Sequence, residues 1–305
     1  RYITNDPSFD GVEGRVTVAV SDTHKGGTNE KFTGVINIPV IDDTLAFRVS
    51  ATYKDDSGWI DQPLAGLEDI NDTELSNIRI KGLWQASDEL AVRGTAIRHR
   101  NNFGATNIVN TTPLAQSNLQ RAIFPTEPPL LGYDDYDLTN LTVDYDFGFA
   151  TLTSSSSWVD QESVIDDTQF WEATFGSVAL LITDWLKGSN SFTQDVRLTS
   201  NSSSNTNKGI NWTVGVYYND VDSIVDLRQA WFAVDSGSPT NFSGTAVGLT
   251  ESTSKSIAYY VDASYAITDQ FTIGLGTRYF DDDKTQTRFY GAEDGLLREA
   301  SFDKL

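Results

Sequence analysis

The sequence of 305 residues contains no cysteine, no methionine and only two histidines. A zinc site built from cysteine and histidine is therefore excluded, because His24 and His99 are distant in sequence and no thiolate is present. The absence of cysteine suits an envelope compartment, in which stray thiols are a liability, but it excludes no other location. Because no methionine begins it, we take the chain to be a fragment or a processed piece.

Long hydrophobic runs and positive charge are also scarce. No stretch approaches the roughly 20 apolar residues that a membrane-spanning helix requires. Lysine and arginine number 22 against 43 acidic residues, and the net charge of -21 argues against nucleic acid as a partner, since phosphate binding relies on cationic side chains.

The acidic residues cluster, and we expect these clusters to lie in solvated connections between strands. They include Asp55–Asp56, Asp134–Asp135, Asp166–Asp167 and Asp281–Asp283. The last cluster also suggests oxygen ligands for a hard cation, although it lacks the spaced ligands of a calcium loop.

What the chain does contain is hydrophobic alternation with a period of two residues. In 45–53, for example, Leu45, Phe47, Val49, Ala51 and Tyr53 alternate with smaller or polar residues. Successive side chains of a strand point to opposite faces, so each such segment has one apolar and one polar face. The pattern predicts eleven strands, at about 13–22, 30–40, 45–54, 74–85, 90–100, 135–146, 149–160, 190–200, 210–219, 253–266 and 271–280, and another begins as the chain ends.

The connections between these strands alternate in length. Tight turns are expected at about 41–44, 86–89, 146–148, 201–209 and 267–270, with long connections at the opposite ends of the strands, including 101–134, 161–190 and 219–252. This layout is typical of an all-β, antiparallel up-and-down transmembrane β-barrel, of which the chain would supply a partial barrel of about eleven strands. A large soluble β-sandwich or β-solenoid, with the aromatic residues filling its core, is the alternative.

Two further expectations concern aromatic residues. Those on the apolar faces predict a girdle at each membrane interface. Trp84, Tyr145, Trp212, Tyr265 and Phe271 would lie near the tight turns, and Tyr53, Tyr218 and Tyr279 near the long connections. Within 161–190, the spacing of apolar residues from Trp171 to Leu186 predicts a short helix folded onto a loop.

Several segments resemble the TonB-dependent outer-membrane receptors. The segment 1–7 looks like the last plug strand of that family, while 34–40 and 45–50 are similar to its second and third barrel strands and 58–61 to the stretch after them. The segment 191–200 resembles the eighth-strand pattern, with Asp195 where glutamate is commoner, and 212–218 and 274–279 resemble later strands. Each motif is weak alone, but their order and spacing are specific, and the resemblance covers essentially the whole chain.

The resemblance implies a barrel of about 22 strands with a plugged lumen. Residues 1–7 would end the plug and 8–305 would form the N-terminal half of the barrel, with the rest of the plug, its TonB box and the remaining strands missing. The implied function is import of a scarce nutrient across the bacterial outer membrane, a ferric siderophore being the commonest substrate. The implied partners are a TonB-type energy-coupling protein acting through the plug, the small-molecule ligand and outer-membrane lipid, with no nucleic acid.

The resemblance also implies two sets of site residues. Lumen-facing charges should meet carboxylates of the plug, or else be solvated or paired with neighbouring strands; they are Arg48, Arg79, Lys81, Arg93, Arg197 and Arg278. Loop aromatics should form a ligand-contacting rim, or else pack loops together; they are Trp59, Phe170, Trp171, Trp185, Trp231 and Phe232.

The sequence does not favour an enzyme. It has no Gly-x-Ser-x-Gly nucleophile elbow, and Gly274 and Gly276 lie within a strand pattern that no helix follows, so no phosphate-binding loop is indicated. We expect no cofactor and no metal. A passive porin and a soluble or surface-attached β-rich binding protein remain as alternatives: the plug-like lead counts against the porin, while the soluble protein predicts connections of similar length at both ends and no lipid-facing band.

Overall fold

In the described residues, the fold is a single antiparallel sheet of twelve strands that follow one another in sequence order. The computed structural model describes residues 4–61, 66–104, 132–172, 178–201, 210–235, 238–268, 270–291 and 297–303, without the side chains of 166–182, 230–246, 290 and 297–303. The strands are β1 Glu13–Asp22, β2 Thr28–Ile41, β3 Leu45–Asp56, β4 Thr73–Gln85, β5 Leu90–Phe103, β6 Gly132–Asp146, β7 Ala150–Glu172, β8 Val178–Ser200, β9 Ile210–Asp235, β10 Ser238–Thr268, β11 Phe271–Gly291 and β12 Leu297–Asp303.

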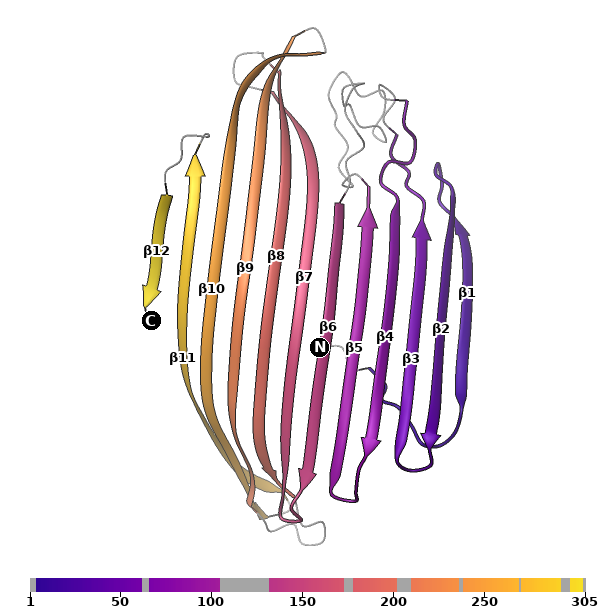
Figure 1. The fold of residues 1–305 in the computed structure, drawn as a ribbon, viewed down its shortest axis with the longest axis vertical. Helices are drawn as coiled ribbons and strands as arrows, with labels where there is room; N and C mark the ends of the chain where they lie inside the picture. The colour runs from indigo at the N-terminus through magenta and orange to yellow at the C-terminus, as the bar shows by residue number, and fades with distance from the viewer. Residues whose placement is uncertain are drawn as a thin grey trace.

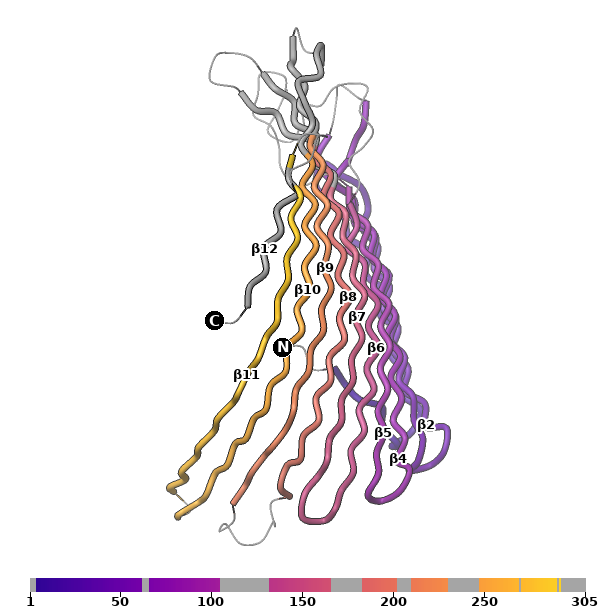
Figure 2. Tube along the Cα trace, turned by 60° about the vertical axis from the view of Figure 1, so that its left-hand side comes forward, coloured from indigo at the N-terminus to yellow at the C-terminus, as the bar shows by residue number. Residues whose placement is uncertain are grey.

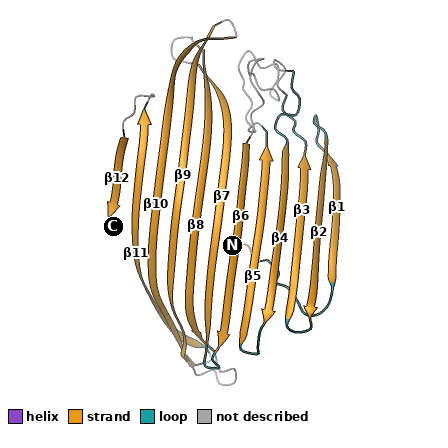
Figure 3. Cartoon of the chain, in the orientation of Figure 1, coloured by secondary structure: helices purple, strands orange, loops and turns teal. Residues whose placement is uncertain are grey.

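Each strand pairs only with its neighbours in sequence, so the chain runs up and down across the sheet (Figures 1 and 3). The sheet is curved but not closed, and β1 and β12 form its two edges (Figure 2). This arrangement confirms the predicted partial up-and-down barrel. In the part of the chain that the structure describes, no helix is long and apolar enough to cross a membrane.

The two faces of the sheet differ in chemistry, as the alternation predicts. On one face, which we call the outer face, large apolar side chains are exposed along every strand from β1 to β4; on β1 they are Val16, Val18 and Val20, 66% to 68% exposed. The opposite face, which we call the inner face, carries the ion pairs described below. Since the described strands form one sheet without a second layer against the apolar face, a sandwich core is excluded for them.

The two ends of the sheet differ as well. At the turn end, three or four residues join β2 to β3, β4 to β5 and β6 to β7, while at the loop end β3 and β4 are 16 residues apart (57–72). Aromatic residues lie near both ends of the outer face: Trp84 and Phe271 lie beside the turn end, and Tyr53 lies toward the loop end, all at least 42% exposed. Tyr279 lies near the middle of β11 rather than at its loop end. That these residues form girdles at membrane interfaces stays a prediction.

The predicted helix over 171–186 is wrong. Its first two residues end β7 and its last nine lie in β8, where Trp171 pairs with Ala179 and Ile165 with Trp185. A short, nearly continuous apolar run cannot be assigned to helix or strand by periodicity alone. Here the ladder with β7 on one side and β9 on the other satisfies the backbone of 178–186.

The long connections expected at 161–190 and 219–252 are also wrong. Most of both stretches belongs to the tall strands β7 to β10, which are 23, 23, 26 and 31 residues long (Figure 1). The sequences of their upper parts show no sustained apolar alternation, so periodicity did not predict strands there.

The acidic clusters also lie in strands rather than in connections. In β11, Asp282 points to the inner face, where its carboxylate lies 2.7 Å from Lys284 and accepts a hydrogen bond from Ser254. Asp281 and Asp283 belong to the other face by alternation. The three carboxylates therefore cannot surround one cation, and no group of metal-ligating residues occurs in the described portion of the chain.

One close contact on the inner face depends on a glycine. Tyr260 of β10 lies across Gly215 of β9 and donates a hydrogen bond of 2.8 Å to Asp195 of β8. A Cβ atom at position 215 would lie 2.4 Å from the Tyr260 hydroxyl oxygen and 2.5 Å from its ring carbon Cζ. The glycine thus lets one side chain span three strands.

We predict that Gly215→Ala destabilises the full-length protein by about 1–3 kcal/mol, the usual effect of overfilling a packed site. Gly94→Ala, in β5, is the matched control because a Cβ there meets nothing within 4 Å. The measurement is the thermal midpoint in detergent. Equal unfolding temperatures for Gly215→Ala and Gly94→Ala would contradict the close contact between Tyr260 and Gly215. Adding Tyr260→Ala to Gly215→Ala should restore stability, because it removes the ring that the new Cβ atom meets.

Candidate functional site

The inner face holds all six cationic residues proposed from the sequence. By strand alternation they share the face of Asn37 and Asp195, and four of them pair with carboxylates of this chain. The pairs are Arg48–Glu13 at 3.0 Å, Lys81–Asp6 at 2.6 Å, Arg93–Asp144 and Arg197–Asp195 at 2.5 Å. Arg48, Arg93 and Arg197 thus pair with carboxylates of the strands, whereas Asp6, the partner of Lys81, lies in the segment 1–7 that resembles the end of a plug.

The other two cations, Arg79 and Arg278, have no carboxylate within 4 Å among the described residues. Arg278 instead lies over two aromatic rings, with its guanidinium carbon 5.7 Å from the centre of Tyr217 and 5.3 Å from that of Phe280. A guanidinium stacked on aromatic rings keeps its hydrogen-bond donors free at the edges. Arg278 is therefore oriented and still able to bind an acidic partner.

The N-terminal segment Thr4–Gly11 also lies on the inner face. The Lys81 ammonium contacts the Thr4 and Asn5 carbonyl oxygens at 3.2 Å each, and Asn37 bonds the backbone of Ser8 and Gly11. Figure 1 shows this segment running from the lower end of β1 across the neighbouring strands. Sequence reasoning missed Asn37, whose only signal was an amide within a strand pattern.

At the loop end, residues 57–72 form a small core of their own. Ile60 and Ile70 are 1% and 9% exposed and pack with Leu67. The Asn71 side-chain oxygen accepts hydrogen bonds of 2.8 Å from the backbone N–H groups of Trp59 and Ile60.

Close backbone contacts complete this folded loop. A Cβ atom on Gly58 would lie 2.2 Å from the Asp69 carbonyl oxygen, so only glycine fits. Trp59 follows directly and is 37% exposed. The loop therefore presents the predicted aromatic residue on a fixed backbone, and Asn71 is a positioning residue that sequence reasoning missed.

The remaining predicted rim aromatics lie in strands rather than loops. Phe170 and Trp171 belong to β7, and Trp231 and Phe232 to β9; their side chains are outside the described residues. Trp185 lies in β8, 37% exposed, with the Lys187 ammonium 4.8 Å from its ring centre. The backbone register places Phe170, Leu180 and Phe232 in one row across the tall strands.

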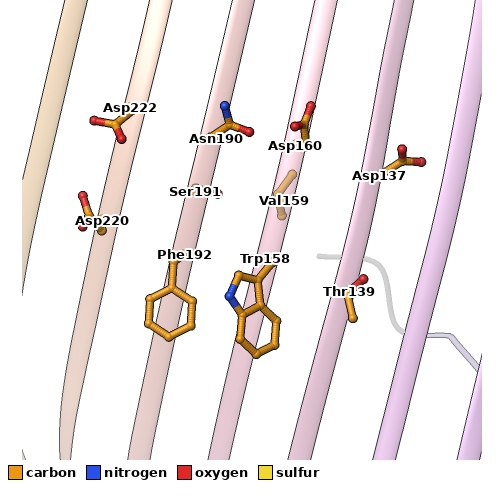
Figure 4. A pocket seen from close by; sticks show the side chains of 10 residues that line it. All are labelled: Asp137, Thr139, Trp158, Val159, Asp160, Asn190, Ser191, Phe192, Asp220 and Asp222. Atoms are coloured by element: carbon orange, nitrogen blue, oxygen red, sulfur yellow. The ribbon is translucent and has the colours of Figure 1, made fainter.

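A shallow hollow on the outer face marks a sharp change in polarity (Figure 4). Asp137, Asp160, Asn190 and Asp222 form one row across β6 to β9 above the rings of Trp158 and Phe192, whose centres are 5.3 Å apart. Two residues along a strand, about 7 Å, thus separate aromatic from acidic side chains. Because the hollow faces away from the inner face, we read it as the upper boundary of the apolar band and not as a ligand site.

The histidines and the groups with shifted pKa values form no catalytic arrangement in the described residues. His99 stacks on Tyr136 with ring centres 4.8 Å apart and lies 3.2 Å from the Asn77 amide, while His24 is exposed in a loop. Above the acidic row, hydrogen bonding to Glu162 raises the pKa of Tyr133 to about 12; within the row, hydrogen bonding to the Arg100 guanidinium lowers the pKa of Asp137. These are paired surface groups and not a nucleophile with its base.

Comparison with known proteins identifies the fold. The sequence matches no protein-family model and no curated protein. The structure is similar to the ferric yersiniabactin uptake receptor FyuA from Yersinia pestis, with a TM-score of 0.73 and 17% identity over 99% of this chain and 44% of that one. The resemblance to TonB-dependent siderophore receptors is thereby confirmed at the level of the fold, and the chain spans less than half the length of that receptor.

Two further solved structures are less similar. They are the siderophore receptor PirA from Acinetobacter baumannii, with a TM-score of 0.40, 9% identity and coverage of 98% of this chain and 63% of that one, and the ferric enterobactin receptor PfeA from Pseudomonas aeruginosa, with a TM-score of 0.41, 11% identity and coverage of 96% and 60%.

We predict that Asn71→Ala loosens the folded loop, because it leaves the N–H groups of Trp59 and Ile60 without their acceptor. Two unsatisfied donors cost about 1–3 kcal/mol each when they stay buried. Hydrogen exchange of these two amides should therefore accelerate. Asn71→Asp is the control, since its carboxylate keeps the acceptor; equal exchange in Asn71→Ala and the unmodified protein would contradict the assignment.

Proposed function

We propose that this chain forms part of the barrel of a TonB-dependent transporter in the bacterial outer membrane, and that the transporter imports a ferric siderophore. The observation that carries the proposal is the division of the sheet into an apolar outer face and a charged inner face that already holds a peptide segment. An apolar outer face suits lipid, while a charged inner face suits a lumen that is filled by protein. The fold shared with a siderophore uptake receptor supports the substrate class.

The inner-face segment distinguishes this proposal from a passive porin. Lys81 and Asn37 hold Thr4–Gly11 where an open pore would need water. In the proposed transporter this segment joins the barrel to a plug, on which an energy-coupling protein pulls from the periplasm. Arg79 and Arg278, whose charges find no carboxylate within 4 Å among the described residues, are proposed to bind acidic groups of that plug.

We propose that ligand recognition takes place at the loop end. Trp59 stands on the folded loop held by Asn71, and Trp185, Phe170, Trp171, Trp231 and Phe232 belong to strands that reach the same end. Aromatic side chains on fixed backbones give a large contact area at a small entropic cost.

Deletion of the gene is expected to abolish the uptake of at least one ferric siderophore by iron-starved cells, and a protonophore should abolish the same uptake in the parent. The measurement is accumulation of radioactive iron supplied as catecholate, hydroxamate or mixed chelates. Unchanged uptake of all of them in the deletion strain would refute the proposal. Uptake that persists with the protonophore would favour the porin.

The same assay tests the proposed plug contacts. Arg79→Gln and Arg278→Gln should lower uptake, whereas Arg228→Gln should not. Arg228 is a suitable control because it is an exposed cation of β9, paired with Asp226 at 2.9 Å. If all three variants transport equally well, the two inner-face arginines do not contact a plug.

Trp59→Ala is expected to weaken siderophore binding by about 1–2 kcal/mol, roughly 5- to 30-fold, as for an aromatic contact residue. The measurement is fluorescence titration of the purified full-length protein with the siderophore that the deletion strain fails to import. Trp158→Ala is the matched control, because Trp158 is a similarly exposed tryptophan of the outer face. Equal affinities in the two variants would remove Trp59 from the binding site.

A further inference from the structure

Four side chains on the inner face form one row across the first four strands. The register pairs Glu13 of β1 with Asn37 of β2, Asn37 with Arg48 of β3, and Arg48 with Lys81 of β4. We call Glu13, Asn37, Arg48 and Lys81 the inner row. All four make contacts that hold either the N-terminal segment Thr4–Gly11 or the start of β1.

Asn37 directs both hydrogen-bond donors of its amide, and its oxygen as an acceptor, to this segment. Its nitrogen donates to the Ser8 carbonyl at 2.9 Å and to the Gly11 carbonyl at 3.0 Å, and its oxygen accepts from the Ser8 N–H at 2.9 Å. The side chain is fully buried. An asparagine amide has two donor hydrogens, and both are used.

Lys81 holds the other end of the segment. Its ammonium contacts the carbonyl oxygens of Thr4 and Asn5 at 3.2 Å and the Asp6 carboxylate at 2.6 Å. A lysine ammonium has three donor hydrogens, which matches these three acceptors. The side chain is only 12% exposed, and Pro7, between the two anchors, is buried.

The position of Asn37 determines how the inner row would resist a force that pulls on the N-terminal segment. Asn37 pairs with Glu13, the first residue of β1, so it stands where β1 would begin to separate from β2. A pull on the segment without an anchor would open the β1–β2 ladder one pair at a time from this end. Asn37 of β2 contacts Ser8 and Gly11, and Lys81 of β4 contacts the segment nearer its N-terminal end, so the pulling force is shared between β2 and β4. The Arg48–Glu13 ion pair fixes the first residue of β1 to β3.

We propose that the inner row is a clamp that keeps Thr4–Gly11 fixed to the barrel wall while the domain preceding it is pulled. The proposal rests on the proposed function, because that function supplies the pull. Asn37 and Lys81 are positioning residues in this scheme and contact no transported ligand.

The clamp itself is tested first without ligand or energy, in the purified full-length protein. Asn37→Ala and Lys81→Gln should each accelerate hydrogen exchange of the amides in 4–11 by on the order of tenfold, as expected when buried hydrogen bonds are lost. Asn140→Ala is the matched control. Asn140 lies in the same row of the register; its amide nitrogen contacts Ser155, Ser156 and Ser157 and its oxygen accepts from Thr142, but neither atom contacts the segment. Equal exchange in Asn37→Ala and Asn140→Ala would overturn the clamp.

The mechanical step is then tested by pulling the full-length protein from its N-terminal side with an atomic force microscope. The force at which β1 leaves the sheet should fall in Asn37→Ala and remain unchanged in Asn140→Ala; equal forces in the two variants would overturn the proposal. A third readout uses a spin label on Asn5→Cys in energised membranes, with any cysteine outside these 305 residues replaced by serine, since the 305 residues themselves contain none. The label should stay immobile during import, and a label that becomes mobile would show release instead of clamping.

These outcomes separate the clamp from the transport proposal. Exchange and pulling need neither substrate nor energy, so they can support the clamp even if the siderophore assay fails. Intact uptake combined with unchanged exchange in Asn37→Ala would instead leave the transporter standing and remove the clamp.

Discussion

The backbone hydrogen-bond ladder is the constraint on which the rest of this structure depends. The backbone N–H and C=O groups of each strand find their hydrogen-bond partners in the neighbouring strands. The described part of the chain has no second layer that packs against the sheet. In lipid this requirement leaves only helices and closed barrels as spanning structures. Among the described residues, β1 and β12 are the two edge strands, each paired on one side only.

Within this ladder, successive side chains point to opposite faces, so the two faces of the sheet differ in chemistry. Buried apolar residues are few among those described, and those of the strands are alanines, so packing between layers contributes little to the stability of the sheet. Side chains of the inner face supply the cross-strand contacts instead, as with Tyr260 above Gly215 and Asn37 beneath the N-terminal segment. Polar contacts thus take the place that a hydrophobic core has in a soluble domain.

The sequence predicted the fold well wherever one face meets an apolar environment. The strand at 45–54 differs from β3 by two residues, and the turn at 41–44 lies where the structure has it. The upper halves of β7 to β10 were not predicted, since their sequences show no sustained alternation to detect. Asn37 and Asn71 were missed for another reason: the contacts of Asn37 join residues 26 to 29 positions apart, and the contacts of Asn71 join residues 11 and 12 apart, distances that no local pattern encodes.

The uninterrupted register of β7 and β8, from Ala150 opposite Ser200 to Glu172 opposite Val178, has a consequence for how such a molecule can change. Two residues added to each arm above Trp158 raise the hairpin by one pleat and return every side chain to its former face. One residue added to each arm turns the upper hairpin inside out, yet leaves the side chains of the apolar band below it on their faces. The height and the facing of the upper hairpin can therefore vary in discrete steps without a change in the apolar band.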